Sequence, residues 1–396
     1  MKNTFSVCCR AAVPDPASFA YLSPERVKDA AAFHSGLPGY AFTPLRDLPA
    51  LAETLGVSRI LVKDESARFG LNAFKALGAS YAIGKLLCER LDLKPDEETY
   101  RQLMQPRYRE LLHGMTFITA TDGNHGRGVA WAAKLLGCRA VVYLPQGTAE
   151  ARLKNIQALG AEAAITAMNY DDTVRHAAET AAEHGWVLVQ DTAWEGYEEI
   201  PAAIMQGYTT MAREIRQQLS ELGEEAPTHL FLQAGVGSMA AAMAGYSAAL
   251  WKERCPRIIL VEPAAADCLY RTAAADDGRL RCVRGRMDSM MAGLCCGEPN
   301  PLAWQVLKQT ASVFVSCDDS VAAEGMRVLG LPRGSDPVIV SGESGAVTTG
   351  AMVRILSDPS LSDVRRRLEL NSDSRILLIS TEGDTDPVNY QKILNT

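Results

Sequence analysis

The sequence lacks long hydrophobic runs and has no excess of basic residues. No stretch of about 18 apolar residues occurs, so we expect no membrane span, and the opening "MKNTFSVCCRAAVPDPASF" has no apolar targeting core. Lys and Arg number 40 against 47 Asp and Glu, which leaves no surplus of cations for nucleic-acid phosphates. The arginine run 365–367 is balanced by nearby acids and predicts a solvated helix. We therefore expect no membrane or nucleic-acid partner.

Patterns that bind metals are also missing. The ten cysteines are scattered, and the vicinal pairs at 8–9 and 295–296 belong to no paired CxxC set. The six histidines are not clustered. We therefore expect the reduced thiols of a cytoplasmic protein and no metal site.

The length and the pattern of elements predict two α/β regions. A chain of 396 residues exceeds one ordinary core, and no repeat or low-complexity linker divides it. Short apolar segments alternate with helical segments that end at glycine, which predicts βαβ units and parallel sheets. We expect a large domain of residues 1–85 and 200–396 and a small domain of residues 86–199. The segments expected to be strands are 59–63, 115–120, 139–145, 161–166, 186–190, 228–235, 257–263 and 375–381.

One loop between a predicted strand and a predicted helix has the features of an anion site. In "TATDGNHGRG" (119–128), Gly123 lets the turn close, and the helix that follows presents free backbone N–H groups. Such a helix start binds a carboxylate or a phosphate. The alternative is a tight turn without a ligand, and His125 by itself would more often be structural.

A second loop resembles a phosphate cradle. In "LQAGVGSMA" (232–240), Gly235 and Gly237 flank Val236, and Ser238 begins a helix. No GK[ST] follows, so this is not a nucleotide P-loop, and the glycine spacing is not a full GxGxxG, which disfavours a nicotinamide cofactor.

Polar residues follow two further predicted strands, in "VQDTAWEGY" (189–197) and "LISTEGDTD" (378–386). Ligands bind beyond the carboxyl ends of parallel strands, so both segments are candidates. The alternative for each is a solvated turn or a helix cap, as for Asp191.

Lys75 indicates which kind of reaction these loops could support. It stands in "LNAFKALGAS" (71–80), directly before a helix rich in Ala and Gly. A lysine that forms an imine needs a cofactor that accepts electrons and carries a phosphate handle, which describes pyridoxal 5′-phosphate. The alternative is an ordinary surface lysine.

The segments around Lys75 and Gly123 resemble those of a known enzyme family. "KDESARFGLNAFKALG" is similar to the K-x-E…[ST]-F-K-x-R-G segment, and "TDGNHGRG" to the S-x-G-N-H loop, of pyridoxal-phosphate enzymes in the tryptophan synthase β-subunit and threonine dehydratase superfamily. More narrowly, the chain resembles the 2,3-diaminopropionate ammonia-lyases. The blocks that carry this narrower resemblance are 63–75, 120–133, "QDTAWEGY", "AGLCCGEPNPLAW" and "STEGDTD".

The resemblance implies the fold type II architecture, with two open, twisted, mostly parallel sheets and flanking helices, and a homodimer. It implies that Lys75 forms the Schiff base with the cofactor and that Asn124 hydrogen-bonds the cofactor's phenolic oxygen. A hydroxyl of Ser380 or Thr381 would face the pyridine nitrogen and leave it largely unprotonated. The loop 121–125 would bind the substrate carboxylate. The remaining implied contacts are the backbone N–H groups of Gly235, Val236, Gly237, Ser238 and Met239 for the phosphate, and Thr121, Asp122, Gly123 and His125 for the substrate.

One departure from the dehydratase pattern indicates the substrate. Those enzymes have Ser-small-Gly-Asn where this chain has "TDGN", and the extra carboxylate of Asp122 suits a substrate with a second ammonium group. The Ser and Arg of the dehydratase lysine segment are replaced by Ala73 and Leu77. We therefore predict α,β-elimination of 2,3-diaminopropionate to pyruvate and two ammonia. The predicted catalytic residues are Lys75, Asp122 and Asp191.

We further hypothesise that Lys75 removes the α-proton of the L form and Asp122 that of the D form. Three alternatives stay open. They are a serine/threonine dehydratase of the same fold, a β-replacement enzyme, and a protein that binds the cofactor without turnover.

Overall fold

The computed structural model describes residues 4–121 and 123–396, and the chain divides into two compact units. The first unit comprises the described residues up to Ser23, Phe42–Ala73 and Ala212–Thr396, and the second comprises Pro24–Ala41 and Phe74–Met211. The predicted division differs at its edges, since residues 24–41, 74–85 and 200–211 cluster with the second unit. Packing explains part of this difference. A Cβ on Gly84 would lie 2.3 Å from the Phe33 ring, so the helices that carry these two residues touch closely.

The first unit is built on a seven-stranded sheet in the order β1-β10-β9-β8-β11-β3-β2. The five inner strands run parallel, and β1 and β2 are antiparallel at the two edges. The strands are β1 (Phe5–Cys9), β2 (Leu45–Asp47), β3 (Arg59–Asp64), β8 (His229–Gln233), β9 (Arg257–Pro263), β10 (Ala311–Cys317) and β11 (Arg375–Ser380).

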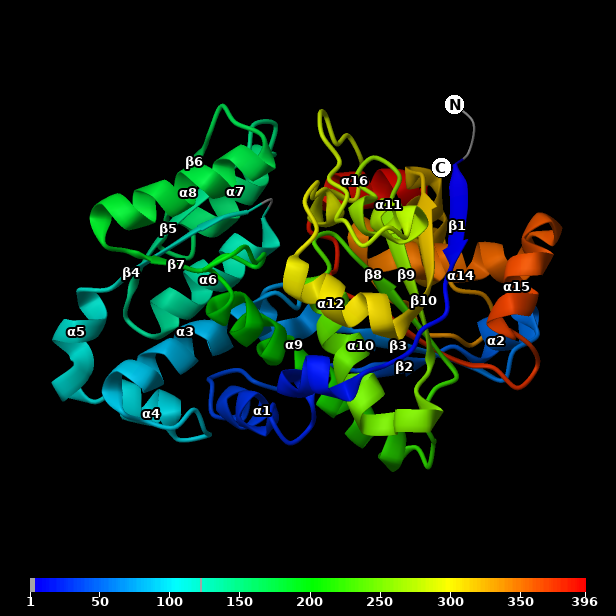
Figure 1. The fold of residues 1–396 in the computed structure, drawn as a ribbon, viewed down its shortest axis with the longest axis horizontal. Coiled ribbons are helices and arrows are strands. Elements are labelled where there is room, and N and C mark those ends of the chain that lie inside the picture. The colour runs from blue at the N-terminus through cyan, green and yellow to red at the C-terminus, as the bar shows by residue number, and fades with distance from the viewer. Residues whose placement is uncertain (1–3, 122) are drawn as a thin grey trace. The chain divides into compact units, whose positions relative to one another are not determined.

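Helices cover both faces of this sheet. In Figure 1, α10 and α12 lie in front of strands β8 to β10, and α14 lies behind them. The helices of the unit are α2 (Pro49–Leu55), α10 (Ser238–Trp251), α11 (Cys268–Ala275), α12 (Pro301–Thr310), α13 (Asp319–Gly330), α14 (Glu343–Ser357), α15 (Ser362–Leu368) and α16 (Pro387–Leu394). Helix α9 (Glu199–Glu221) belongs to this unit from Ala212 onwards.

Small residues allow these layers to pack tightly. All five residues of β8 are buried, as expected of a strand covered on both faces. A Cβ on Gly350 of α14 would lie 1.9 Å from the Val321 carbonyl oxygen of α13, so these two helices meet backbone to backbone. A Cβ on Gly245 of α10 would lie 2.8 Å from Leu22. Larger residues at these positions would push the helices apart, because protein interiors have no room to spare.

The second unit is built on a parallel four-stranded sheet in the order β6-β5-β4-β7. Figure 1 shows α8 on one face and α6 with α3 on the other. The strands are β4 (Thr116–Ala120), β5 (Arg139–Leu144), β6 (Glu162–Ile165) and β7 (Val187–Leu188). The helices are α1 (Lys28–Ser35), α3 (Ala76–Leu91), α4 (Thr99–Leu103), α5 (Arg109–His113), α6 (Asn124–Leu135), α7 (Glu150–Gln157), α8 (Tyr170–His184) and α9 up to Met211.

Short 3-10 helices complete the described part of the chain. They are η1 (Pro16–Leu22), η2 (Glu65–Gly70), η3 (Pro106–Tyr108), η4 (Lys252–Arg254), η5 (Ala292–Leu294) and η6 (Pro359–Leu361). The predicted α/β class with two mostly parallel sheets is confirmed.

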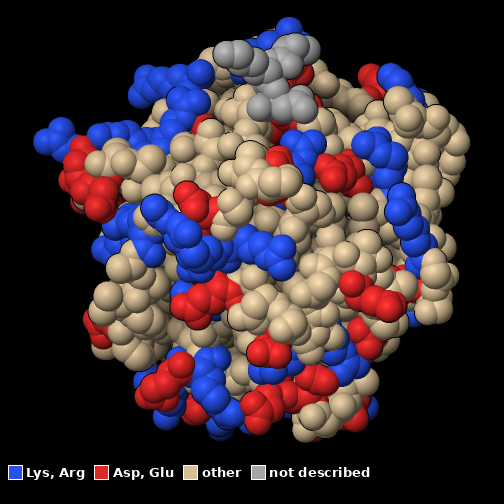
Figure 2. Space-filling model, turned by 90° about the vertical axis from the view of Figure 1, so that its right-hand side faces the viewer, with Lys and Arg blue, Asp and Glu red and all other residues tan. Residues whose placement is uncertain are grey.

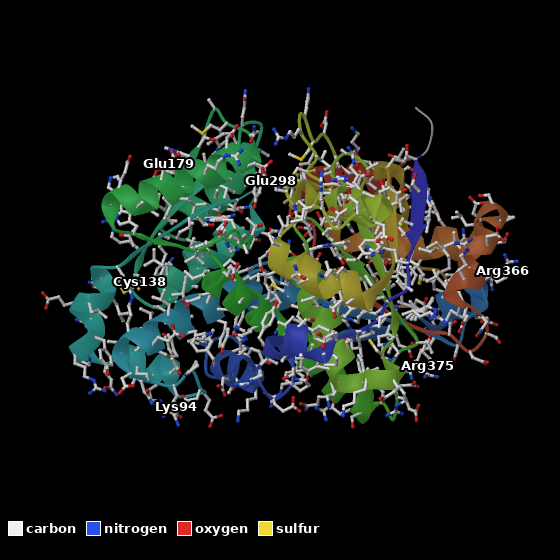
Figure 3. All side chains as sticks on the ribbon, viewed as in Figure 1. Lys94, Cys138, Glu179, Glu298, Arg366 and Arg375 are labelled. Atoms are coloured by element: carbon white, nitrogen blue, oxygen red, sulfur yellow. The ribbon has the colours of Figure 1, made fainter. Side chains whose placement is uncertain are left out.

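The surface carries charges of both signs. On the face shown in Figure 2, basic and acidic side chains are interspersed. The arginine run 365–367 lies on the last turn of α15, where exposed Arg366 pairs with Asp363 at 2.8 Å (Figure 3). None of the described helices has both the length and the apolar character needed to cross a bilayer. Outside residues 1–3 and 122, no group of three or more His, Cys, Asp or Glu side chains is arranged to bind a metal.

Candidate active site

In the second unit, Lys75 and Asp191 form an ion pair. Lys75 is the N-cap residue of α3, and its Nζ contacts Asp191 Oδ2. The side chain of Lys75 is 18% exposed and that of Asp191 is 4% exposed. The two residues are 116 positions apart in the sequence, and the fold brings together the ends of two segments that were singled out separately.

The environment holds Asp191 in its ionised form. Burial alone would raise the pKa of this carboxyl, but the charges of Lys75 and His125 and the hydrogen bond from Lys75 lower it to about 2. A buried carboxylate keeps its charge only beside such partners. Asp191 is therefore ionised at neutral pH and pairs with the Lys75 ammonium, and it can donate a proton only after it has accepted one.

His125 lies behind this pair. It is buried, and its Nε2 lies 2.8 Å from the carbonyl oxygen of Val189. A carbonyl only accepts hydrogen bonds, so Nε2 carries the proton and donates. Nδ1 faces Asp191 Oδ2 at 3.8 Å. At this distance His125 lies beside Asp191 without a direct hydrogen bond between the two atoms, and its contact with substrate stays a prediction.

The loop before α6 is held by its own side chains. The hydroxyl of buried Thr121 accepts hydrogen bonds from the backbone N–H groups of Gly123 and Gly126 at 2.9 and 3.0 Å. Gly123 has φ +153°, a conformation open to glycine but strained for other residues. Asn124 is the first residue of α6. Asp122, the predicted second carboxylate of this loop, lies outside the described residues.

Close packing places Lys75 against the same helix. A Cβ on Gly128 of α6 would lie 3.1 Å from the backbone of Lys75 and Ala76. The motif "GNHGRG" therefore has two roles. It begins helix α6, and its last glycine lets the backbone of Lys75 pack directly against that helix. A larger residue at position 128 would displace α3 from α6.

Buried polar residues that the sequence patterns did not reveal fix the loop of Asp191. Gln190 is fully buried, and its Oε1 accepts hydrogen bonds from the Ala120 backbone N–H and the Thr119 hydroxyl, both at 3.0 Å. The Tyr197 hydroxyl accepts from the Gln190 backbone N–H at 2.8 Å and donates to the Leu188 carbonyl. These bonds set the direction in which the chain leaves β7 and so the position of Asp191.

In the first unit, the glycine-rich loop after β8 leads directly into α10. Gly237 has φ +100°, and a Cβ on Gly235 would lie 3.2 Å from the Leu294 backbone. Asn300, another residue that the patterns did not reveal, holds this loop. Its side-chain amide donates to the Ser238 hydroxyl at 2.8 Å, and its backbone N–H donates to the Val236 carbonyl at 2.9 Å. The backbone N–H groups of residues 235–239 thus belong to a turn and a helix start, which suit a phosphate.

Two hydroxyls lie at the end of β11 in the same unit, on its last residue Ser380 and on Thr381. Ser380 Oγ donates to Ser341 Oγ at 2.7 Å. Thr381 Oγ1 instead accepts from Gln233 Nε2 at 2.9 Å. The orientation of the Gln233 amide is fixed, because Nε2 also donates to the carbonyl oxygens of Ser344 and Ile379. The hydroxyl proton of Thr381 is therefore the one available for an acceptor.

A buried network fixes the segment that precedes Lys75 in the chain. Lys63 Nζ pairs with Glu214 at 2.6 Å, and Arg68 bridges Glu214 and Glu65 at 2.8 Å. All four side chains are at most 1% exposed. Buried ions of this kind are tolerated only when each is paired, so the motif "KDESARFG" is held rigidly within the first unit.

Comparisons with known proteins agree with this geometry. Residues 37–382 match the family described as "Pyridoxal-phosphate dependent enzyme". The diaminopropionate ammonia-lyase of Salmonella typhimurium is 51% identical over 364 residues, which are 92% of this chain and 90% of that protein.

Two crystal structures of the Escherichia coli diaminopropionate ammonia-lyase are similar to this structure. One is a complex with an aminoacrylate-PLP azomethine reaction intermediate, with a TM-score of 0.88, and the other is a complex with D-serine, with a TM-score of 0.89. Each is 47% identical and covers 99% of this chain and 97% of its own. The chain therefore belongs to the diaminopropionate ammonia-lyase family of pyridoxal-phosphate dependent enzymes.

Proposed function

We propose that this chain removes ammonia from 2,3-diaminopropionate by α,β-elimination, in the L and the D form, and yields pyruvate and two ammonia. The observation that carries the proposal is the buried pair of Lys75 and Asp191, in a chain 51% identical to a diaminopropionate ammonia-lyase. A lysine amine and a carboxylate in contact can exchange the proton that this elimination must move.

The residues present fit pyridoxal 5′-phosphate. Lys75 would bond the aldehyde carbon, residues 235–239 would bind the phosphate through backbone N–H groups, and Asn124 would donate to the phenolic oxygen. Thr381, whose hydroxyl proton is available, would face the pyridine nitrogen in preference to Ser380. When bound, the cofactor supplies a sink for the negative charge left at the substrate α-carbon.

The residues of the chain would then move two protons. Lys75 passes a proton to Asp191 and becomes a neutral amine, which takes the α-proton of the L form. Asp191 returns its proton to the 3-amino nitrogen as the carbon–nitrogen bond breaks, because an amine leaves readily only when protonated. Acid–base help of this kind typically contributes about 100- to 10,000-fold.

Asp122 would serve the D form as the base on the opposite side of the α-carbon. Its carboxylate would also attract the second ammonium group of the substrate. A substrate with a 3-hydroxyl group gains nothing from this charge, so the serine/threonine dehydratase alternative is less well supported.

We also propose a homodimer in the cytoplasm. Symmetric dimers are the commonest assembly of soluble enzymes. None of the ten cysteines, all of which lie within the described residues, forms a disulfide, which suits a reducing compartment.

The experiment that tests the function counts both products. We expect the protein loaded with pyridoxal phosphate to release one pyruvate and two ammonia for each 2,3-diaminopropionate consumed. The elimination gives the first ammonia, and hydrolysis of the released enamine gives the second. One ammonia with no pyruvate would indicate a replacement reaction, and no consumption of substrate would overturn the proposal.

A further inference from the structure

Tyr208 carries a buried hydroxyl that the mechanism above does not use. It lies on α9 within the second unit and is 0% exposed. Its hydroxyl has no hydrogen-bond partner among residues 4–121 and 123–396. A buried hydroxyl left unpaired destabilises the fold, so its retention calls for an explanation.

Packing brings this hydroxyl to the start of α3. Helices α9 and α3 approach through two glycines, since a Cβ on Gly207 would lie 2.5 Å from the Leu77 carbonyl oxygen. A Cβ on Gly78 would lie 2.5 Å from Tyr208 Cε1 and 2.7 Å from Cζ, the atom that bears the hydroxyl. Only glycine at these positions lets the phenol lie against the first turn of the helix.

The same turn begins with Lys75. Residues three apart in a helix are neighbours on one face, so Lys75 and Gly78 lie side by side. The Phe74 ring links them, because its centroid lies 4.8 Å from that of Tyr208 and 5.7 Å from Lys75 Nζ. Tyr208 and the Lys75 amine thus pack against the same Phe74 ring.

Among the described residues, three ionisable groups of this unit belong to the surroundings of the Lys75–Asp191 pair. They are Asp191 after β7, His125 on α6 and Tyr208 on α9. Burial raises the pKa of Tyr208, while the charges of Lys75 and Asp191 act on it in opposite directions. The phenol therefore stays protonated in the neutral range and can donate a hydrogen bond.

We propose that Tyr208 is a positioning residue whose hydroxyl donates a hydrogen bond to the neutral amine of Lys75. The inference rests on the proposed function, in which Lys75 must lose a proton before it can bond the cofactor or take the α-proton. When that proton moves to Asp191, one N–H bond breaks, one O–H bond forms, and Lys75 exposes a lone pair. A donor directed at that lone pair favours the neutral amine, and the Tyr208 hydroxyl has no hydrogen-bond partner among the described residues.

The substitution Tyr208→Phe tests this role without changing the shape of the core. The readout is the rate at which cofactor-free protein takes up pyridoxal phosphate on Lys75, followed by the visible absorbance of the bound cofactor between pH 6 and 10. We expect the profile of the variant to move to higher pH by about one unit, which makes uptake at pH 7 about tenfold slower. At high pH the amine is neutral without help, so the rates should converge.

Steady-state kinetics give a second readout. With diaminopropionate, kcat of Tyr208→Phe should fall by about the same factor at pH 7 and recover at alkaline pH, while KM changes by less than about twofold. Tyr81→Phe is the matched control. Tyr81, on α3, is a buried tyrosine like Tyr208, but its ring packs against Phe33. The pH profiles of Tyr81→Phe should therefore equal those of the unchanged protein.

A second variant guards against a folding defect. A fluorinated tyrosine at position 208 keeps the hydroxyl and the packing but makes the phenol a stronger donor, so we expect a shift to lower pH. The inference would be overturned if the pH profiles of both variants superimposed on that of the unchanged protein. A higher Tm for Tyr208→Phe would then show that the buried hydroxyl only destabilises the fold. If the unchanged protein takes up cofactor but releases no pyruvate, the proposed function is wrong. The uptake profiles would still test the role of Tyr208, because they do not depend on turnover.

Discussion

Replacing Lys75 with alanine is expected to lower the rate of pyruvate release from diaminopropionate by at least about a thousandfold. The variant loses the amine that bonds the cofactor and the base that takes the α-proton of the L form. It also leaves the carboxylate of Asp191 buried without its cation, which typically costs about 3–5 kcal/mol of stability. Activity and thermal unfolding should therefore both change.

Two further variants separate these effects. Lys75→Arg keeps a cation beside Asp191, so we expect stability close to that of the unchanged protein but no cofactor absorbance and no activity. Lys85→Ala removes a half-exposed lysine of the same helix that faces Glu89 at 3.9 Å, and it should behave like the unchanged protein. Substantial activity in Lys75→Arg, or its loss in Lys85→Ala, would contradict the assignment of Lys75.

The second large effect is expected for Asp122→Asn. Asparagine cannot accept a proton, so kcat/KM for the D form should fall about 100-fold or more, as is usual for the loss of a general base. The L form keeps Lys75 as its base and should lose less than about tenfold, through the weaker attraction of the second ammonium group.

Paired kinetics with the two enantiomers measure this difference. Asp172→Asn is a suitable control, since Asp172 is an exposed carboxylate on α8 that pairs with Arg175, and neither enantiomer should be affected. Equal losses for L and D diaminopropionate in Asp122→Asn, with cofactor uptake unchanged, would show that the bases are not divided in this way.

Much of the parallel framework could be predicted from the sequence. The apolar segment 257–263 is β9 to the residue, and α8 is one of the helices that end at a glycine as expected, with Gly185 as its C-cap. These elements can be recognised in the sequence because buried strands are continuously apolar and glycine commonly ends helices. The strands β1, β2 and β10 were not predicted. The edge strands β1 and β2 are short or only half-buried, and pairing with β10 and β3 holds them in place.

The candidate site was predicted residue by residue but not as an arrangement. Lys75 and Asp191 each stood out, yet their contact depends on the pairing of β4 with β7 and on the crossing of α3 and α6, which spacing does not encode. Gln190 and Tyr208 were missed for a different reason. Buried Gln and Tyr side chains are common in ordinary cores, so neither residue type signals a site, and only the hydrogen bonds that each makes or lacks reveal its role.

The central claim is that this chain prefers an amine as the leaving group. The most direct test is to compare kcat/KM for pyruvate release from L- and D-2,3-diaminopropionate and from D-serine, and for 2-oxobutanoate release from L-threonine. We expect diaminopropionate to be the better substrate by at least about 100-fold, because Asp122 attracts the second ammonium group and Asp191 protonates it as it leaves. A preference for the hydroxy amino acids would contradict the account and make the chain a dehydratase.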